Sequence, residues 1–266
     1  MTTTAAESTG RSEAGGIRAV SRALAVLDCF ENEGQSLTLA ELVRRCELPR
    51  TTVLRLVDTL VGERMLQLLP DGRVSVGPRM IRWGAFAKAA WSAPAATLAR
   101  LQQLADETGE TVSLYVRRGL TRVAIAQAPG RHTLRHVVQV GDELPIWLGA
   151  ASTTLLSGER PEVLDSVLAA LDANTAIDVD TSALRDRVAA IREQGWGLSH
   201  GERESGNSGL AMLVPEVGDR PLLQPVVVVL GGPTARFVDA RIPEFVAALR
   251  ACVQDVPQTG LPPALE

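Results

Sequence analysis

The feature that most constrains the fold is a series of three short helix patterns and a turn, all within residues 17–78. The second pattern opens at Thr38 with Glu41 three residues later, which is the spacing of a capping box. The third places apolar side chains at helical intervals from Val53 to Leu60. Two such helices in close succession predict a helix-turn-helix unit.

A turn signal follows the third helix pattern. Pro70-Asp71-Gly72 lies between apolar residues of the stretch 65–77, which predicts a β-hairpin. The first pattern, ahead of Thr38, consists of apolar residues at helical spacing, namely Val20, Ala23, Leu24, Leu27 and Phe30. Three short helices and a hairpin are the plan of a winged helix-turn-helix domain, which we predict for residues 17–78.

The rest of the chain predicts a second domain and two tails. Residues 1–16 have nothing to bury and are expected to be a disordered tail, and residues 257–266 a C-terminal tail. The stretch 79–91 is apolar on several sides, so we interpret it as a linker helix and dimer seam. Residues 92–256 mix both periodicities, which predicts an α+β domain with a sheet flanked by helices. We expect helices near 94–108, 150–157, 161–171, 182–194 and 239–255, and strands at 111–117, 121–128, 133–140, 196–200, 209–214 and 225–230.

The third helix has a polar face opposite its apolar stripe. At 100° per residue this face carries Thr51, Arg55 and Asp58. A recognition helix presents its N-terminal half to base edges in the major groove, and arginine and threonine side chains can bond those edges. We therefore predict base contacts from Arg50, Thr51, Thr52 and Arg55. The alternative is a solvated face on which Arg55 pairs with Asp58 or another local acid.

Other residues of the predicted domain are candidates for phosphate contacts. Arg73 lies at the hairpin turn, where it would reach backbone phosphate or the minor groove. Ser21 and Arg22, beside the start of the first helix, would hold phosphate, and Thr38 completes the predicted DNA-binding set. The formal net charge of −4 does not argue against this, because a small basic face suffices on an acidic molecule.

Composition excludes several other classes of protein. No stretch of about 18 apolar residues occurs, so we expect no membrane span, and residues 1–16 lack the apolar run of a signal peptide. The three cysteines, Cys29, Cys46 and Cys252, form no Cys-x-x-Cys pair, so we expect neither a disulfide framework nor a metal site. We interpret them as small core residues in a reducing cytoplasm.

Several segments, taken in order, resemble one known family. They are Ala19–Leu27, the stretch TLAELVRRCELPRTTVLRLVDTL with the hairpin that ends in VGPR, and LADETGETVSLYV, VGDELPIWLGAAS and IREQGWGLSHGERESG further on. Together they are similar to the IclR family of bacterial transcriptional regulators, over about residues 17–255. The resemblance implies a winged helix-turn-helix on a GAF-like effector-binding domain. It also implies a homodimer or homotetramer that binds double-stranded operator DNA in response to a small molecule, often a carboxylic acid, with no cofactor.

The resemblance places the effector near residues 141–154. There the family has small residues followed by Gly-Lys; here the small residues remain as Gly149 and Ala150, while Ser152-Thr153 replaces the Gly-Lys step and removes a cation. Small residues at a helix start would let a carboxylate approach unpaired backbone N–H groups, although the same pattern also suits a plain capped helix. Trp147 and Trp196 would wall a flat pocket for an aromatic ligand, or pack as core residues.

By resemblance, the segment 197–210 supplies another wall of the pocket. It contains Ser199, His200, Glu202, Asn207 and Ser208, with Gly209 where the family often has cysteine. Val229 stands where the family often has serine, so we expect a less polar pocket.

Two other functions remain open from the sequence. One is a small-molecule hydrolase that uses His200, Glu202, Ser205 and Ser208, although GNSGL is not a Gly-x-Ser-x-Gly elbow and no P-loop or His-Glu-x-x-His motif occurs. The other is a regulator without a ligand, which acts through protein contacts alone. We predict the ligand-controlled regulator and no enzymatic activity.

Overall fold

The computed structural model describes residues 17–30, 36–135, 138–216 and 222–265, so the predicted tail 1–16 lies outside the described residues. The chain divides into two compact units, Met1–Ala87 and Lys88–Glu266, and each is described by itself.

The N-terminal unit contains three helices and a hairpin. They are α1 (Arg18–Asp28), α2 (Leu39–Cys46), α3 (Arg50–Gly62) and the antiparallel pair β1 (Leu66–Leu68) and β2 (Val74–Val76). One apolar core joins all of these elements. A backbone bridge between Leu37 and Val74 ties the hairpin to the segment before α2. These elements form a winged helix-turn-helix, with the hairpin as its wing.

The apolar stripe predicted for the first helix is confirmed in its C-terminal part. Ala23, Leu27 and Phe30 pack in or against the core together with Val26, whereas Val20 and Leu24 are 54% and 41% exposed. The two cysteines of this unit also come together, since the Sγ atoms of Cys29 and Cys46 lie 3.3 Å apart and link α1 to α2. Only the part of α1 near its C-terminal end therefore packs against the other helices of this unit.

The helix α4 (Arg79–Trp91) includes the boundary between the two units and has the bounds expected for the linker helix. None of its residues is buried, and Ile81, Trp83 and Phe86 are exposed large apolar side chains.

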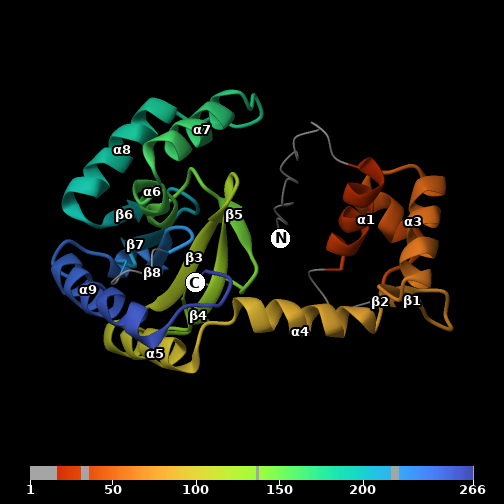
Figure 1. The fold of residues 1–266 in the computed structure, drawn as a ribbon, viewed down its shortest axis with the longest axis horizontal. Coiled ribbons are helices and arrows are strands. Elements are labelled where there is room, and N and C mark those ends of the chain that lie inside the picture. The colour runs from red at the N-terminus through yellow and green to blue at the C-terminus, as the bar shows by residue number, and fades with distance from the viewer. Residues whose placement is uncertain (1–16, 31–35, 136–137, 217–221, 266) are drawn as a thin grey trace. The chain divides into compact units, whose positions relative to one another are not determined.

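The C-terminal unit is built on a six-stranded antiparallel sheet in the order β5-β4-β3-β8-β7-β6 (Figure 1). Its strands are β3 (Thr111–Arg118), β4 (Thr121–Ala128), β5 (Glu143–Pro145), β6 (Gly197–His200), β7 (Asn207–Leu213) and β8 (Val226–Pro233). Because β3 and β8 lie at the centre with apolar residues on both sides, the sheet needs helices on both faces.

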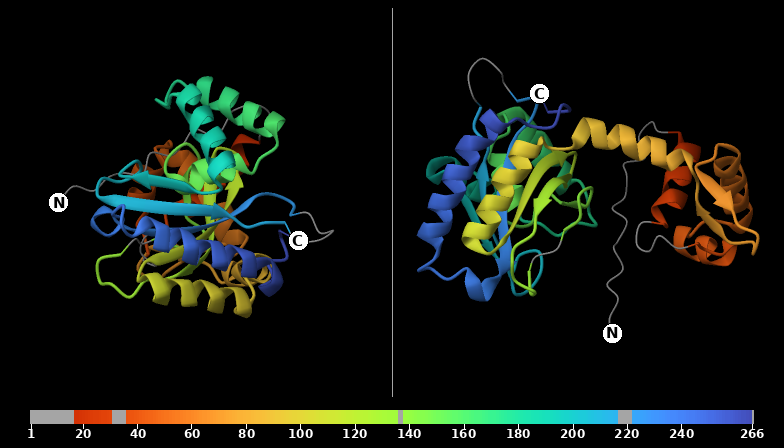
Figure 2. Two further views of the ribbon diagram at one scale, coloured as in Figure 1. Left: turned by 90° about the vertical axis from the view of Figure 1, so that its left-hand side faces the viewer. Right: turned by 90° about the horizontal axis from the view of Figure 1, so that it is seen from below.

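Two helical layers cover this sheet, as Figure 2 shows. One layer consists of α5 (Ala95–Thr108) and α9 (Ile242–Thr259), which pack against the larger of two apolar cores. The other consists of α6 (Ala150–Ser157), α7 (Pro161–Asp172) and α8 (Thr181–Gln194) around the second core, and a short 3₁₀ turn, η1 (Thr234–Arg236), follows β8. This is an α+β domain, as predicted.

Two sequence predictions for this domain were wrong. The described part of 133–140 forms no strand, because the edge of β4 is already taken: Ala124 exchanges hydrogen bonds with Gly141 and Asp142, and β5 pairs beyond them. Residues 257–266 are not a tail as far as the structure describes them. The helix α9 continues to Thr259, and Leu261 and Leu265 are buried in the core.

No helix in the described part of the chain is both long and apolar enough to cross a membrane. Among the described residues, no group of three or more His, Cys, Asp or Glu side chains is arranged to hold a metal ion.

The packing of the C-terminus gives a first prediction. Leu265 is fully buried, so Leu265→Ala should lower the free energy of unfolding of the C-terminal domain by about 2–5 kcal/mol. Leu223→Ala is the matched control, because that side chain is 72% exposed and its loss should change stability by less than about 0.5 kcal/mol. Urea unfolding measures both, and equal stabilities would mean that the C-terminus does not pack.

Candidate DNA-binding surface and effector pocket

The exposed face of α3 carries the side chains predicted to contact bases. Val53, Val57 and Leu60 are buried, while Arg50, Thr51, Arg55 and Asp58 are exposed and Thr52 is half-buried. The turn before α3 contains Glu47 with φ of 52° and ends at Pro49, the N-cap. No ion pair joins Arg55 to Asp58 or to another acid among the described residues, so its guanidinium remains available to a ligand.

The N-terminus of α3 is electrostatically suited to an anion. No side chain caps it and its first turn has no acidic residue, so the positive end of the helix dipole is not neutralised. With Arg50 beside it, this end of the helix favours phosphate. Ser21 and Arg22 are exposed on α1, as a phosphate contact requires.

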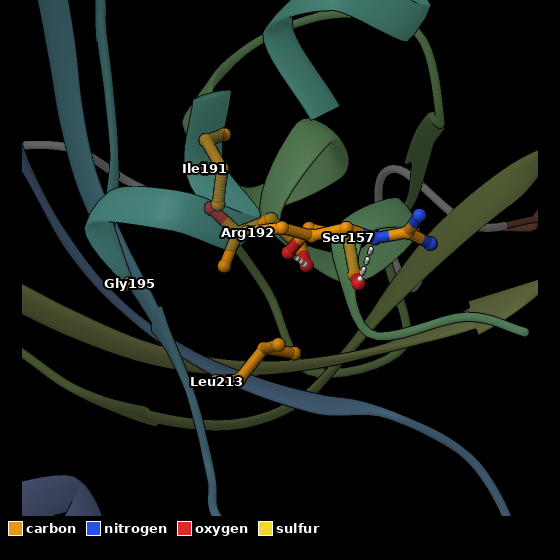
Figure 3. A pocket seen from close by; sticks show the side chains of 6 residues that line it. Ser157, Ile191, Arg192, Gly195 and Leu213 are labelled. Carbon is orange, nitrogen blue, oxygen red and sulfur yellow. Dashed lines mark hydrogen bonds between the residues drawn. The ribbon is translucent and has the colours of Figure 1, made fainter. Parts of the chain in front are cut away.

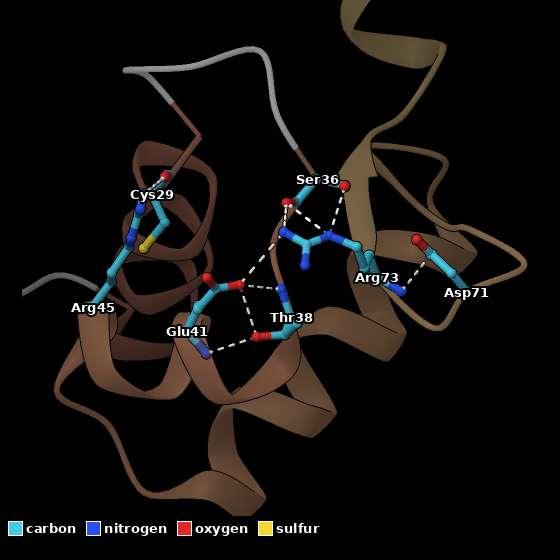
Figure 4. A network of polar contacts seen from close by, with 7 residues as sticks. All are labelled: Cys29, Ser36, Thr38, Glu41, Arg45, Asp71 and Arg73. Atoms are coloured by element: carbon cyan, nitrogen blue, oxygen red, sulfur yellow. Dashed lines mark hydrogen bonds and ion pairs between the residues drawn. The ribbon is translucent and has the colours of Figure 1, made fainter.

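Arg73 is engaged inside the domain rather than extended from the hairpin (Figure 4). Its Nε donates to the carbonyl oxygen of Ser36 at 3.1 Å and to Ser36 Oγ at 2.8 Å, and its Nη2 donates to the same carbonyl. Nη2 also lies 3.6 Å from Glu41 Oε2. The guanidinium of Arg73 thus holds the hairpin to the segment before α2, and its predicted phosphate contact stays a prediction.

Thr38 is likewise used by the fold. Glu41 Oε2 accepts from Thr38 N and Thr38 Oγ1, both at 2.7 Å, and Thr38 Oγ1 accepts from Glu41 N at 3.2 Å. The hydrogen bond from the backbone N–H of Thr38 is the main cause that lowers the pKa of Glu41, and the one from the Thr38 hydroxyl acts in the same direction. The capping box is therefore present as predicted, and it occupies the Thr38 hydroxyl that we had assigned to DNA.

In the C-terminal unit, a pocket lies between the start of α6, the sheet and the turn from β6 to β7. It is lined by Tyr115, Arg122, Gly149, Ala150, Ala151, Ser199, Glu202, Arg203, Glu204, Asn207, Ser208, Gly209, Val229 and Gly231. The predicted pocket residues Gly149, Ala150, Ser199, Glu202, Gly209 and Val229 are among them. Sequence reasoning thus named several residues that line this pocket, while their contact with an effector stays a prediction.

Arg122 is the most unusual of the lining residues, because it is a buried cation. It is only 5% exposed, and burial lowers its pKa to about 10, so the guanidinium is still charged at neutral pH. Nη1 donates to the carbonyl oxygens of Pro145 at 3.0 Å and Leu148 at 2.6 Å, and to Ser152 Oγ. Its Nε has no hydrogen-bond partner among the described residues, and no ion pair to it is found there.

The N-terminus of α6 is already occupied by side chains. Gly149 N donates to Glu202 Oε2 at 3.0 Å, and Ala150 N donates to Ser199 Oγ at 2.9 Å. Glu202 Oε2 also accepts from Arg187 Nη1 at 2.8 Å. The expectation that the N–H groups of Gly149 and Ala150 are unpaired was therefore wrong, because the polar turn after β6 folds over the helix start and caps it.

Three predicted pocket residues lie elsewhere. Trp147 packs against the core that α6 to α8 cover but does not line the pocket, and Ser152 is buried behind it as a partner of Arg122. Trp196 packs in the other core, on the side of α5 and α9. Trp196 is thus on the wrong face of the sheet to wall this pocket.

His200 is also on the face away from α6. Successive residues of a strand point to opposite faces, and Gly197 and Ser199 face α6: a Cβ on Gly197 would lie 2.5 Å from Thr154 Oγ1. His200 therefore points away, and its Nδ1 lies 2.8 Å from Ser208 Oγ, which donates to Thr234 Oγ1. Among the described residues, no hydrogen bond joins Glu202 to His200 or Ser208, so nothing in this arrangement supports the hydrolase alternative.

A second cavity, of about 190 Å³, lies beside the C-terminal end of α6 (Figure 3). It is lined by Thr154, Ser157, Ile191, Arg192, Gly195 and Leu213. Its ionisable side chain, Arg192, donates to the carbonyl oxygens of Ser157 and Glu159 and so caps α6. The pocket around Arg122 is the better candidate for a ligand.

Comparison with known proteins agrees with this arrangement. Residues 19–70 match the IclR helix-turn-helix domain, and residues 94–258 match the family described as bacterial transcriptional regulator IclR, C-terminal. The chain belongs to the IclR family. It is a DNA-binding transcriptional regulator with a winged helix-turn-helix domain and an effector-binding domain.

Several IclR-family proteins are similar over most of their length. The regulator BhcR of Paracoccus denitrificans is 28% identical over 88% of this chain and 84% of its own. A family member from a Rhodococcus species is 36% identical, covers 97% of this chain and all of its own, and superposes with a TM-score of 0.60. A homologue from Microbacterium hydrocarbonoxydans, solved with 4-hydroxybenzoate, has a TM-score of 0.70 at 20% identity, with 91% and 98% covered, and so shares the fold.

Sequence reasoning missed Tyr115 and Arg122, on β3 and β4, as pocket residues of this IclR-family domain. A signal for Arg122 was present, since it is a charged residue within the otherwise apolar strand TRVAIAQA. Ser152, which accepts a hydrogen bond from Arg122, stands with Thr153 where the family has Gly-Lys. Arg122 therefore supplies a cation near the place where this sequence lacks the lysine of the family.

The contacts of Arg73 give a second prediction. Arg73→Ala should lower the stability of the N-terminal domain by about 1–2 kcal/mol, because three part-buried charge-assisted hydrogen bonds to Ser36 are lost. The slope of log operator affinity against log salt concentration should stay unchanged. Arg22→Ala is the matched control and should reduce that slope by about 1. If Arg73→Ala reduces the slope and leaves the stability unchanged, the result would support the predicted phosphate contact at Arg73.

Proposed function

We propose that this IclR-family protein binds a near-palindromic operator as a homodimer or homotetramer, under the control of a small organic acid. Residues 17–78 form the DNA-binding domain, 79–91 the linker, and residues from 92 onwards the effector domain. The observation that supports base recognition is the exposed face of α3, where Arg50, Thr51 and Arg55 surround an uncapped helix N-terminus.

Self-association is supported by α4. Its side chains Ile81, Trp83 and Phe86 are exposed in the single chain, and several large exposed apolar side chains on one helix are typical of a protein interface. A dimer with two-fold symmetry requires two half-sites on the DNA, about one helical turn or a multiple of it apart. Since operator DNA lies in the cytoplasm of bacteria, we place the protein there.

An acidic effector is supported by the chemistry of the pocket. Arg122 is buried in its wall without a carboxylate partner among the described residues, and a buried cation is stabilised when an anion binds. Tyr115 and Val229 supply apolar surface beside it. The relative solved with 4-hydroxybenzoate makes aromatic acids natural probes, although Trp196 no longer argues for them.

The operator proposal is tested by footprinting on the DNA upstream of the gene. A protected palindrome is expected, and folded protein that protects none would contradict it. Arg55→Ala should cost about 1–3 kcal/mol and relax sequence preference, whereas Arg22→Ala should weaken all sequences alike. If Arg55→Ala binds the operator as the wild type does, the recognition face is wrong.

The effector proposal is tested by calorimetry on the full chain with acetate, benzoate and 4-hydroxybenzoate, each beside its neutral amide. The acids should bind and the amides should not, and the bound acid should change operator affinity about 5- to 150-fold. Arg122→Met should weaken the binding of each acid at least about tenfold, because a charge-assisted contact is lost. If only the amides bind, the proposal of an acidic effector is wrong. If no ligand changes operator binding, the result would favour a regulator that acts through protein contacts.

A further inference from the structure

We propose that Glu202 holds the effector's place in the ligand-free protein, and that the effector's carboxylate displaces it from the start of α6. This inference rests on the proposed acidic effector and adds how the site is regulated.

The first observation is the position of the Glu202 carboxylate. Its Oε2 accepts from Gly149 N at 3.0 Å and from Arg187 Nη1 at 2.8 Å. The first turn of α6 contains no acidic residue of its own, so Glu202 supplies the negative charge at the positive end of this helix. A helix N–H group and an arginine are also the donors that a bound carboxylate uses. Glu202 thus satisfies the site as a ligand would.

The second observation is that Arg122 lies at the same place and is only partly satisfied. A Cβ built on Gly149 would lie 4.0 Å from Arg122 Nη2, so the guanidinium is next to the start of α6. Its buried Nε has no partner among the described residues, and no ion pair between Arg122 and Glu202 is found there. A carboxylate that entered beside Gly149 would therefore contact a cation that Glu202 leaves unpaired.

The third observation is that Glu202 is able to leave. It belongs to the turn between β6 and β7, and its side chain is 27% exposed. On release, its carboxylate returns to water and one negative charge replaces another at α6, so the exchange leaves the charge of the pocket unchanged. A neutral ligand gains nothing from Arg122 and cannot take over the N–H group of Gly149 as an anion can.

The exchange provides a signal. While Glu202 is bound, it connects the turn after β6 with both α6 and α8, through Gly149 and Arg187. When an acid takes its place, this connection opens. The ligand-free and ligand-bound states thus differ in a defined contact, which a ligand with higher affinity for the open state would shift.

The test uses the full chain and the acids and amides named above. Glu202→Gln keeps an acceptor for Gly149 N but removes the competing charge, so the acids should bind about tenfold more tightly and the amides as before. Glu202→Ala, which leaves the N–H group uncovered, should act in the same direction. Glu193→Gln on α8 is the matched control, because this exposed carboxylate touches no pocket residue, and it should change nothing. Thermal unfolding verifies that each variant is folded.

The outcomes separate the two proposals. Displacement is supported if either folded Glu202 variant binds an acid more tightly than the wild type does. The same holds if a variant binds an acid for which the wild type shows no measurable affinity. If the wild type binds acids and both variants bind them equally or more weakly, displacement is wrong while the acidic effector stands. If neither the wild type nor the variants bind any acid, both are overturned, and the operator proposal is untouched.

Discussion

The effector domain depends on how the buried guanidinium of Arg122 is accommodated. A cation removed from water is costly unless hydrogen bonds replace its hydration. Here the acceptors are mainly backbone carbonyls, those of Pro145 and Leu148, together with Ser152 Oγ. All of them belong to the segment that leads from β5 into α6. A single side chain of β4 therefore fixes this segment to the sheet and orients the helix start, while its Nε has no hydrogen-bond partner among the described residues.

In the DNA-binding domain another arginine, Arg73, also joins two segments of the fold through its guanidinium. Arg73 reaches the carbonyl oxygen and hydroxyl of Ser36 and approaches Glu41, so it closes the hairpin against the capping box of α2. This helps fix α2, and α3 packs on α2. The arginines of α3 have no such task among the described contacts. The division between arginines that hold the fold and those that face outward is what makes α3, rather than the hairpin, the better candidate for recognition.

These contacts also explain how far the sequence could predict the site. The exposed face of α3, the hairpin and the start of α6 followed from local periodicity and turn residues, and the structure agrees. The error at His200 was avoidable, because Ser199 and His200 are adjacent in a strand and must point to opposite faces. The roles of Arg73 and Arg122 were not predictable in this way. Their partners are 23 to 37 residues away in the sequence, so only the tertiary fold brings them together.

The same reasoning explains why the helix start was wrongly expected to be open. Gly149 has φ of 85° and no side chain to cover the first turn of α6, so an acceptor is needed there in any state of the protein. An N–H group left unpaired in a buried site would cost about as much as a lost hydrogen bond. A protein whose ligand supplies that acceptor must therefore provide a substitute when the ligand is absent. Ser199 performs this task for Ala150 from within the strand, where it is fixed, whereas Glu202 performs it for Gly149 from a turn, where it can be replaced.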